Sequence, residues 1–164
     1  MWIILGLLIF GGFGLGALLG APYLPILAQE REELLDLAAL KPGQTILDLG
    51  CGDGTLLRAA ARRGVRAIGY EINPLLFLLA WLLCLPQRQQ ISVRFGDFWR
   101  ANWPPSDIIY VFLIERYMLK LDRELNSRLS KSTKVVSYVF AIPGRQAVRS
   151  NKNAWVYDYP ISVK

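Results

Sequence analysis

A glycine-rich stretch constrains the fold more than any other feature of this 164-residue sequence. The run Thr45–Leu49 is apolar except for Asp48 and predicts a buried strand. Residues 50–54 read Gly-Cys-Gly-Asp-Gly, and residues 55–63 have the apolar spacing of a helix. Glycines in such a loop let the backbone turn tightly and approach a ligand that a Cβ would exclude. The stretch therefore predicts a strand, a ligand-binding loop and a helix.

The same alternation of strands and helices continues along the chain. Apolar runs typical of strands lie at 67–70, 91–95, 107–113, 134–140 and 154–158, and helical patterns lie at 75–85 and 118–129. This order predicts an α/β, Rossmann-like sheet of six or seven mostly parallel strands, with ligands at their carboxyl ends. Because the sequence stops soon after the sixth run, we expect that a terminal strand can be missing.

Acidic residues around the glycine loop indicate the kind of cofactor. Glu71 ends the second predicted strand, 21 positions after Gly50, which suits a carboxylate that binds a ribose diol. In the dinucleotide fingerprint the third glycine stands one place later than Gly54. The carboxylates of Asp48 and Asp53 flank the loop and would repel a pyrophosphate. They suit the sulfonium and amino groups of S-adenosylmethionine (SAM), so we predict SAM rather than NAD.

Residues 48–54, Asp-Leu-Gly-Cys-Gly-Asp-Gly, resemble motif I of class I SAM-dependent methyltransferases. Residues 20–25 (Gly-Ala-Pro-Tyr-Leu-Pro), 69–73 (Gly-Tyr-Glu-Ile-Asn) and 155–158 (Trp-Val-Tyr-Asp) extend the likeness. With them the chain is similar, from about residue 20 to 158, to the membrane-anchored ATP synthase c-subunit lysine N-methyltransferase family and its prokaryotic relatives. This resemblance implies methyl transfer from SAM to a lysine side chain of a protein substrate.

The resemblance also implies which residues bind SAM. The loop residues Asp48, Gly50, Gly52 and Gly54 would hold the methionine part of the cofactor. Glu71 would bind the ribose hydroxyls, and Asp97 and Phe98 would face the adenine. Asp53 and Asn73 are further candidate cofactor-binding residues. We expect no metal site.

Two residues are candidates for orienting the acceptor amine. Tyr23 would lie in a loop that closes over the cofactor, and Glu115 follows the fourth predicted strand. Tyr23 can equally be a membrane-interface aromatic, and Glu115 an exposed residue that starts a helix. Members of this family commonly have a basic residue at the position of Thr55 and a polar residue at that of Ile26. These departures affect the expected substrate but not the expected cofactor.

The first 29 residues carry no charged side chain, and residues 1–21 are apolar throughout. As a helix, 21 residues would measure about 31 Å, the thickness of a bilayer core. We therefore predict a transmembrane anchor at 1–21, a linker and helix at 22–43, and the SAM-binding domain at 44–164. An uncleaved signal-like segment is the alternative. Gly12, Gly16 and Gly20 would form a ridge for helix pairing.

Since SAM is made in the cytosol, we expect a single-pass membrane protein whose catalytic domain faces the cytoplasm. The span 75–85 is entirely apolar but too short to cross a bilayer, so it would contact the membrane or a partner's N-terminal helix. Burial beneath other helices of the domain is the alternative. The aromatic and basic stretch 98–103 could also lie at the membrane interface.

Composition excludes several functions. The chain has no histidine, which rules out Ser-His-Asp triads and His-ligated zinc, and two cysteines, Cys51 and Cys84, are too few for a disulfide scaffold. The net charge is +6, and Arg58, Arg62, Arg63 and Arg66 form a basic stretch. Anionic lipid or solvent is expected there, and nucleic acid is the least favoured partner. Two alternative functions remain, a methyltransferase for a lipid, quinone or other small molecule, and a non-catalytic SAM- or nucleotide-binding membrane module.

Overall fold

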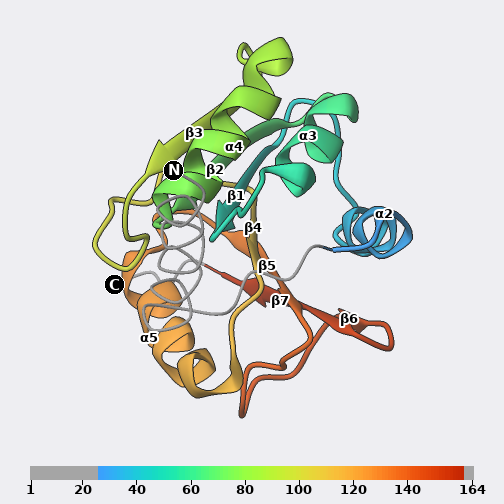
Figure 1. Ribbon diagram of the computed structural model, residues 1–164. Coiled ribbons are helices and arrows are strands. Elements are labelled where there is room, and N and C mark those ends of the chain that lie inside the picture. The colour runs from blue at the N-terminus through green and yellow to red at the C-terminus, as the bar shows by residue number, and fades with distance from the viewer. Residues whose placement is uncertain (1–25, 161–164) are drawn as a thin grey trace.

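The computed structural model describes residues 26–160. These residues form one seven-stranded sheet with helices on both faces (Figure 1). The helices are α2 (Ala28–Leu37), α3 (Thr55–Arg62), α4 (Pro74–Cys84) and α5 (Met118–Arg128), with short 3-10 helices η1 (Leu85–Gln87) and η2 (Glu115–Tyr117). The strands are β1 (Thr45–Leu49), β2 (Arg66–Glu71), β3 (Ile91–Phe95), β4 (Ile108–Val111), β5 (Thr133–Tyr138), β6 (Arg149–Ser150) and β7 (Ala154–Tyr159).

The sheet has the strand order β3-β2-β1-β4-β5-β7-β6. Strands β1 to β5 are parallel to one another, and β7 and β6 are antiparallel to their neighbours. This confirms the predicted Rossmann-like sheet of mostly parallel strands. The expectation of a missing strand was wrong, because β6 supplies a seventh. Two residues are too few to show the alternation by which a strand is recognised in a sequence.

Alternating side chains of the strands form two cores, one on each face of the sheet. On one face Ile46, Ile108 and Val136 pack against α2 and α3. On the other face Leu47 and Ile109 pack, together with other strand residues, against α5. Since the parallel strands all end at one edge, the loops that follow β1 to β5 meet there. This carboxyl edge is where ligands bind in open α/β sheets.

Within residues 26–160, no helix is both long enough and apolar enough to cross a membrane. This finding contradicts the single-pass membrane localisation expected from the sequence. The most apolar helix there, α4, has 11 residues and a length of about 16 Å, half of a bilayer core. The predicted anchor at 1–21, its glycine ridge and Tyr23 lie outside the described residues.

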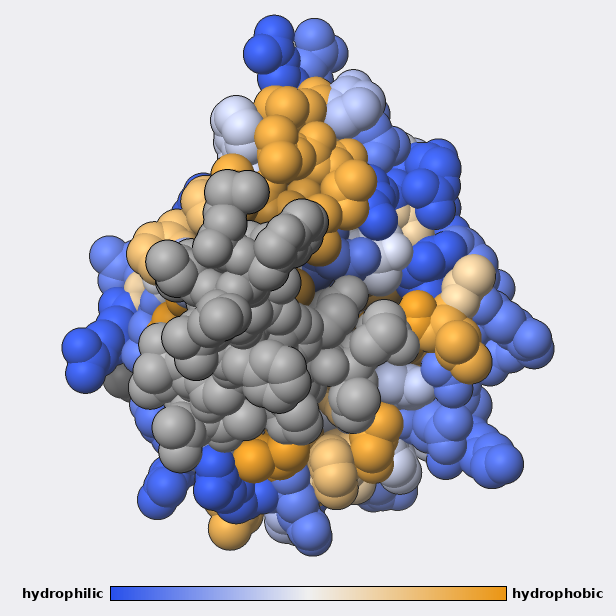
Figure 2. Space-filling model, in the orientation of Figure 1, coloured by the Kyte–Doolittle hydropathy of each residue, from blue (hydrophilic) through white to orange (hydrophobic). Residues whose placement is uncertain are grey.

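Helix α4 exposes most of its apolar side chains. Leu78 is 50% exposed and Leu82 is 49% exposed, and Ala80 and Cys84 are the positions that α4 buries. Figure 2 shows the resulting apolar patch on the molecular surface over α4. The sequence left open that this segment is buried beneath other helices of the domain. That alternative is wrong, because the outer face of α4 is exposed. Such a patch favours association of the protein in water.

We predict that Leu78→Gln and Leu82→Gln together reduce aggregation of the protein and leave its unfolding midpoint within about 2 °C of wild type. Both side chains are half-exposed, and surface substitutions change stability by about 0.5 kcal/mol or less. Light scattering and thermal unfolding check the two parts. As a control, Leu121→Gln in the α5 core should lower stability by about 3–5 kcal/mol. A comparable loss in the double variant would show that the α4 face is a structural core.

Candidate functional site

The loop after β1 is shaped by glycine conformations. Gly50, Gly52 and Gly54 all have positive φ, at 104°, 55° and 72°. A Cβ on Gly54 would lie 2.9 Å from Cys84 Sγ, so the loop packs directly against α4. A Cβ on Gly50 would meet nothing within 4 Å, which leaves the backbone at that position open to a ligand. The predicted roles of these glycines in shaping a tight loop agree with the geometry.

The Glu71 carboxylate at the end of β2 joins the loop to the start of α4. Its Oε2 accepts a hydrogen bond from the Gly52 N–H at 2.9 Å, and its Oε1 accepts one from the Asn73 N–H at 2.8 Å. Burial raises the pKa of Glu71, and these two backbone hydrogen bonds oppose the rise. Each carboxylate oxygen can accept a further hydrogen bond, so both remain able to bind a hydroxyl group.

Asn73 caps α4, and Asp53 accepts a hydrogen bond from the first residue of α3. Asn73 Oδ1 accepts hydrogen bonds from the N–H groups of Leu75 at 2.9 Å and Leu76 at 3.3 Å. Asp53 Oδ1 accepts one from the Thr55 N–H at 3.0 Å, at the start of α3. Both side chains therefore have structural contacts beside the predicted cofactor site.

Asp48, the last polar residue of β1 before the loop, is 2% exposed. Its Oδ1 has no hydrogen-bond partner among the described residues, and neither has the buried hydroxyl of Tyr110, which lies opposite it on β4. Burial raises the pKa of Asp48 well above its usual range, and the Glu71 and Asp53 carboxylates raise it further. An unpaired buried carboxylate is costly, so the site is suited to a ligand with a cationic hydrogen-bond donor.

SAM fits these residues. Its ammonium and sulfonium groups are cationic, and Asp48, Asp53 and Glu71 supply negative charge at the loop. Asp97 follows β3 at the same edge, and its Oδ1 accepts a hydrogen bond from the Trp99 N–H at 2.9 Å. The Gly96 N–H donates to the Glu71 carbonyl at 2.9 Å, which brings the end of β3 beside Glu71. The predicted cofactor residues are thus gathered at one edge.

Other predicted residues are less closely connected with the loop. The Phe98 ring lies 4.6 Å from the Trp99 ring, against the core on the α5 face, and its contact with adenine stays a prediction. Glu115 is exposed at the start of η2, after β4. Its role with an acceptor amine also stays a prediction. Cys51 and Cys84 are buried free thiols, as expected, and burial raises the pKa of both.

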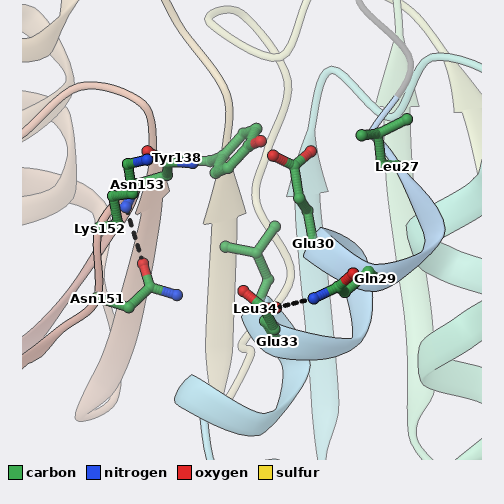
Figure 3. A pocket seen from close by; sticks show the side chains of 9 residues that line it. All are labelled: Leu27, Gln29, Glu30, Glu33, Leu34, Tyr138, Asn151, Lys152 and Asn153. Carbon is green, nitrogen blue, oxygen red and sulfur yellow. Dashed lines mark hydrogen bonds between the residues drawn. The ribbon is translucent and has the colours of Figure 1, made fainter.

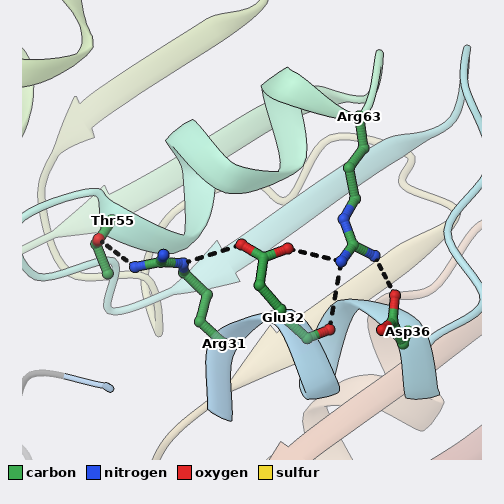
Figure 4. Close-up of polar contacts among 5 residues, drawn as sticks. All are labelled: Arg31, Glu32, Asp36, Thr55 and Arg63. Carbon is green, nitrogen blue, oxygen red and sulfur yellow. Dashed lines mark hydrogen bonds and ion pairs between the residues drawn. The ribbon is translucent and has the colours of Figure 1, made fainter. Parts of the chain in front are cut away.

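One arginine of the basic stretch in and after α3 has a structural role. Arg63 forms ion pairs of 2.6 Å with Glu32 and with Asp36, which both belong to α2 (Figure 4). Arg31 donates a hydrogen bond to Thr55 Oγ1 at 3.1 Å, at the other end of α3. These contacts hold α2 along α3. Sequence reasoning missed them, because the partners are 24 to 31 residues apart.

The sheet order and the acidic glycine loop define a class I SAM-dependent methyltransferase. A family model of the ANTKMT methyltransferase domain matches residues 48–149. The chain belongs to this family.

Two curated relatives and one solved structure illustrate the similarity. The human ATP synthase c-subunit lysine N-methyltransferase is 27% identical over 74% of this chain and 53% of its own length. This chain therefore corresponds to about half of that relative. A protein-lysine N-methyltransferase of Saccharolobus islandicus is 28% identical over 85% of this chain and 93% of its own length. An RNA methyltransferase of Salinibacter ruber, in complex with S-adenosyl-L-homocysteine, has a TM-score of 0.79 and 26% identity over 86% of this chain and 97% of that one.

We predict that Asp48→Asn raises the unfolding midpoint at pH 7 by about 5 °C, since it removes a buried charge without a partner. An acid whose pKa is raised by folding is protonated in both states at low pH. It destabilises the fold increasingly as pH rises from its unfolded pKa to its folded pKa. The gain should therefore disappear near pH 4. Thermal unfolding across pH checks this, with exposed Asp158→Asn on β7 as the matched control. A lower unfolding midpoint of Asp48→Asn than of wild type at pH 7 would contradict the destabilisation that we assign to the buried Asp48 charge.

Proposed function

We propose that this protein transfers the methyl group of SAM to the ε-amino group of a lysine in a protein substrate. The observation that carries the proposal is the match to the Saccharolobus protein-lysine N-methyltransferase over nearly the full length of that protein. The human relative, named for lysine methylation of the ATP synthase c-subunit, supports the same acceptor chemistry.

The chemistry agrees with the residues that this chain possesses. SAM supplies a methyl group on a sulfonium, whose thioether leaving group needs no proton. An enzyme for this reaction therefore needs no general acid, and the absence of histidine is no obstacle. The task of the protein is to bind both reactants, align them and exclude water. Asp48 and Glu71 would hold the cofactor at the loop, and the acceptor would approach over the ends of β4 and β5.

The lysine must lose its proton from Nζ before it can attack, because an ammonium has no free electron pair. Water can accept this proton, and the amine then forms the new N–C bond as the S–C electron pair stays on sulfur. A site of low polarity lowers the pKa of a lysine and so favours the neutral amine. The ring of Phe112, partly buried after β4 and 5.1 Å from the buried ring of Tyr138, would supply such surroundings.

RNA is a second candidate acceptor, favoured by the description of the Salinibacter protein. The charges near the acceptor edge argue against it. Glu30 and Glu33 on α2 line the pocket at the end of β5 with a single cation, Lys152, among its described lining residues, so an RNA backbone would be disfavoured at that place. Lysine, being cationic, is complementary to the same carboxylates.

The proposal is tested with radiolabelled SAM and three separate acceptors: a protein extract, total RNA and lipid vesicles. We expect label in the protein fraction, and acid hydrolysis followed by mass spectrometry should release methylated lysine. Asp48→Asn is the control, because its weakened contact with the SAM ammonium should reduce labelling at least tenfold. Label confined to RNA or lipid would refute lysine as the acceptor. SAM binding by calorimetry without any transfer would favour a non-catalytic SAM-binding module.

A further inference from the structure

A pocket with two carboxylates lies at the carboxyl edge of β5 (Figure 3). Its volume is about 370 Å³. Three elements form it: the first turns of α2, the last residue of β5 and the turn between β6 and β7. The nine residues that line it are Leu27, Gln29, Glu30, Glu33, Leu34, Tyr138, Asn151, Lys152 and Asn153. Within residues 26–160, neither the predicted cofactor residues nor Glu115 line it.

The Tyr138 hydroxyl and the Glu30 carboxylate face each other across this pocket (Figure 3). Burial and hydrogen bonding to Glu30 raise the pKa of Tyr138 to about 12, so the phenol stays protonated at neutral pH. The Tyr138 side chain is 7% exposed, and Phe112 packs against its ring. The pocket thus presents a fixed aromatic ring and a carboxylate side by side.

The charge of the pocket is not balanced by the protein. Glu33 accepts a hydrogen bond from Gln29 Nε2 at 3.0 Å, a neutral donor. Across the described part of the chain, no Lys or Arg nitrogen lies within 4.0 Å of the Glu30 or Glu33 carboxylates. Lys152 lines the pocket but forms no ion pair there. Two carboxylates next to an aromatic ring are therefore left to attract a cation.

The register of the sheet places this pocket on the acceptor side of the cofactor loop. Asp48 on β1 pairs with Tyr110 on β4, and Tyr110 pairs with Val136 on β5. Tyr138, two residues beyond Val136, points to the same face of the sheet. Two strand spacings across the sheet and two residues along β5, together about 12 Å, therefore separate the Tyr138 backbone from that of Asp48. The unpartnered Tyr110 hydroxyl lies on the strand between them.

We propose that this pocket binds the ammonium group of a lysine side chain of the protein substrate, through the Glu30 carboxylate and the Tyr138 ring. The identity of the substrate as a protein lysine rests on the proposed function, whereas the affinity for an alkylammonium rests on the pocket itself. The stem of the lysine contacts Leu27 and Leu34, and Asn151 and Asn153 offer neutral polar contacts to the substrate. A phosphate group or a carboxylate is repelled by the same two glutamates.

Binding of fluorescein-labelled octalysine to the full chain, followed by anisotropy at low salt, tests the proposal. Glu30→Gln should weaken binding about tenfold, because one charge-assisted contact is lost. Tyr138→Phe should keep most of the affinity, since the ring remains. Lys152→Gln should tighten binding, because it removes a competing cation. Fully acetylated octalysine, which lacks the ammonium groups, should not bind.

The matched control is Asp158→Asn, which makes the same change in charge at the opposite edge of the sheet, where Asp158 pairs with Lys134. It should leave octalysine binding unchanged. Equal weakening by Glu30→Gln and Asp158→Asn would overturn the proposal, because binding would then follow net charge alone. Unchanged binding in Glu30→Gln would overturn it as well.

Calorimetry with SAM separates this test from the proposed function. Glu30→Gln should bind SAM as tightly as wild type, which shows that the fold and the cofactor loop are intact. If methyl label appears only in RNA or lipid while octalysine binding still depends on Glu30, the lysine methyltransferase function fails and the cation pocket stands. If protein is labelled but octalysine binding is independent of Glu30, the function stands and the pocket assignment fails.

Discussion

The candidate site depends on one carboxylate, that of Glu71. Its two oxygens accept hydrogen bonds from Gly52 in the loop after β1 and from Asn73 at the start of α4. Gly50, Gly52 and Gly54 of this loop have positive φ, and the N–H groups of Gly50 and Cys51 donate to the Tyr70 carbonyl. Without the Glu71 carboxylate, the Gly52 N–H would be left without this acceptor in a buried place. The same carboxylate, 8% exposed, stands where the resemblance places the cofactor ribose. We therefore propose that the fold and cofactor binding depend on the same side chain.

Helix α2 is held in position by charge, and this affects the acceptor side of the site. Arg63 at the end of α3 pairs with Glu32 and Asp36, and Arg31 bonds to Thr55 at the start of α3. These contacts lie on one side of α2. Leu34 and Leu35 on the helix pack into the core, and Glu30 is left facing β5. A helix fixed along α3 in this way gives Glu30 a defined position relative to Tyr138.

Local patterns predicted the sheet, the glycine loop and Glu71, because strand, loop and helix follow one another within about 30 residues. The hydrogen bond between Glu71 and Gly52 was not predictable. The number of residues between the glycine loop and Glu71 can indicate a carboxylate that binds a ribose, but it does not indicate a contact within the protein. The pocket was missed for a related reason. Glu30 and Tyr138 are more than 100 residues apart, and Tyr138 sits in an apolar run that predicts only a strand. That run extended to residue 140, yet the strand ends at Tyr138, because Val139 adopts a positive φ of 70°.

The distribution of charge at the carboxyl edge explains how two cations can meet there. A sulfonium and a lysine ammonium repel each other, and the repulsion grows as water is excluded. Asp48, Asp53 and Glu71 lie at the cofactor loop, and Glu30 on α2 faces the end of β5. Negative charge therefore lies beside the cofactor loop and beside the proposed lysine pocket. Among the described residues that line the pocket, Lys152 is the one basic side chain, and it forms no ion pair with them. A bound sulfonium would lower the pKa of the arriving amine, whereas the Glu30 carboxylate would raise it, and proton loss would leave a neutral nucleophile that is no longer repelled. We therefore propose that the acidic surroundings favour the arrival of the lysine and that the charge of the cofactor favours its conversion to the reactive form.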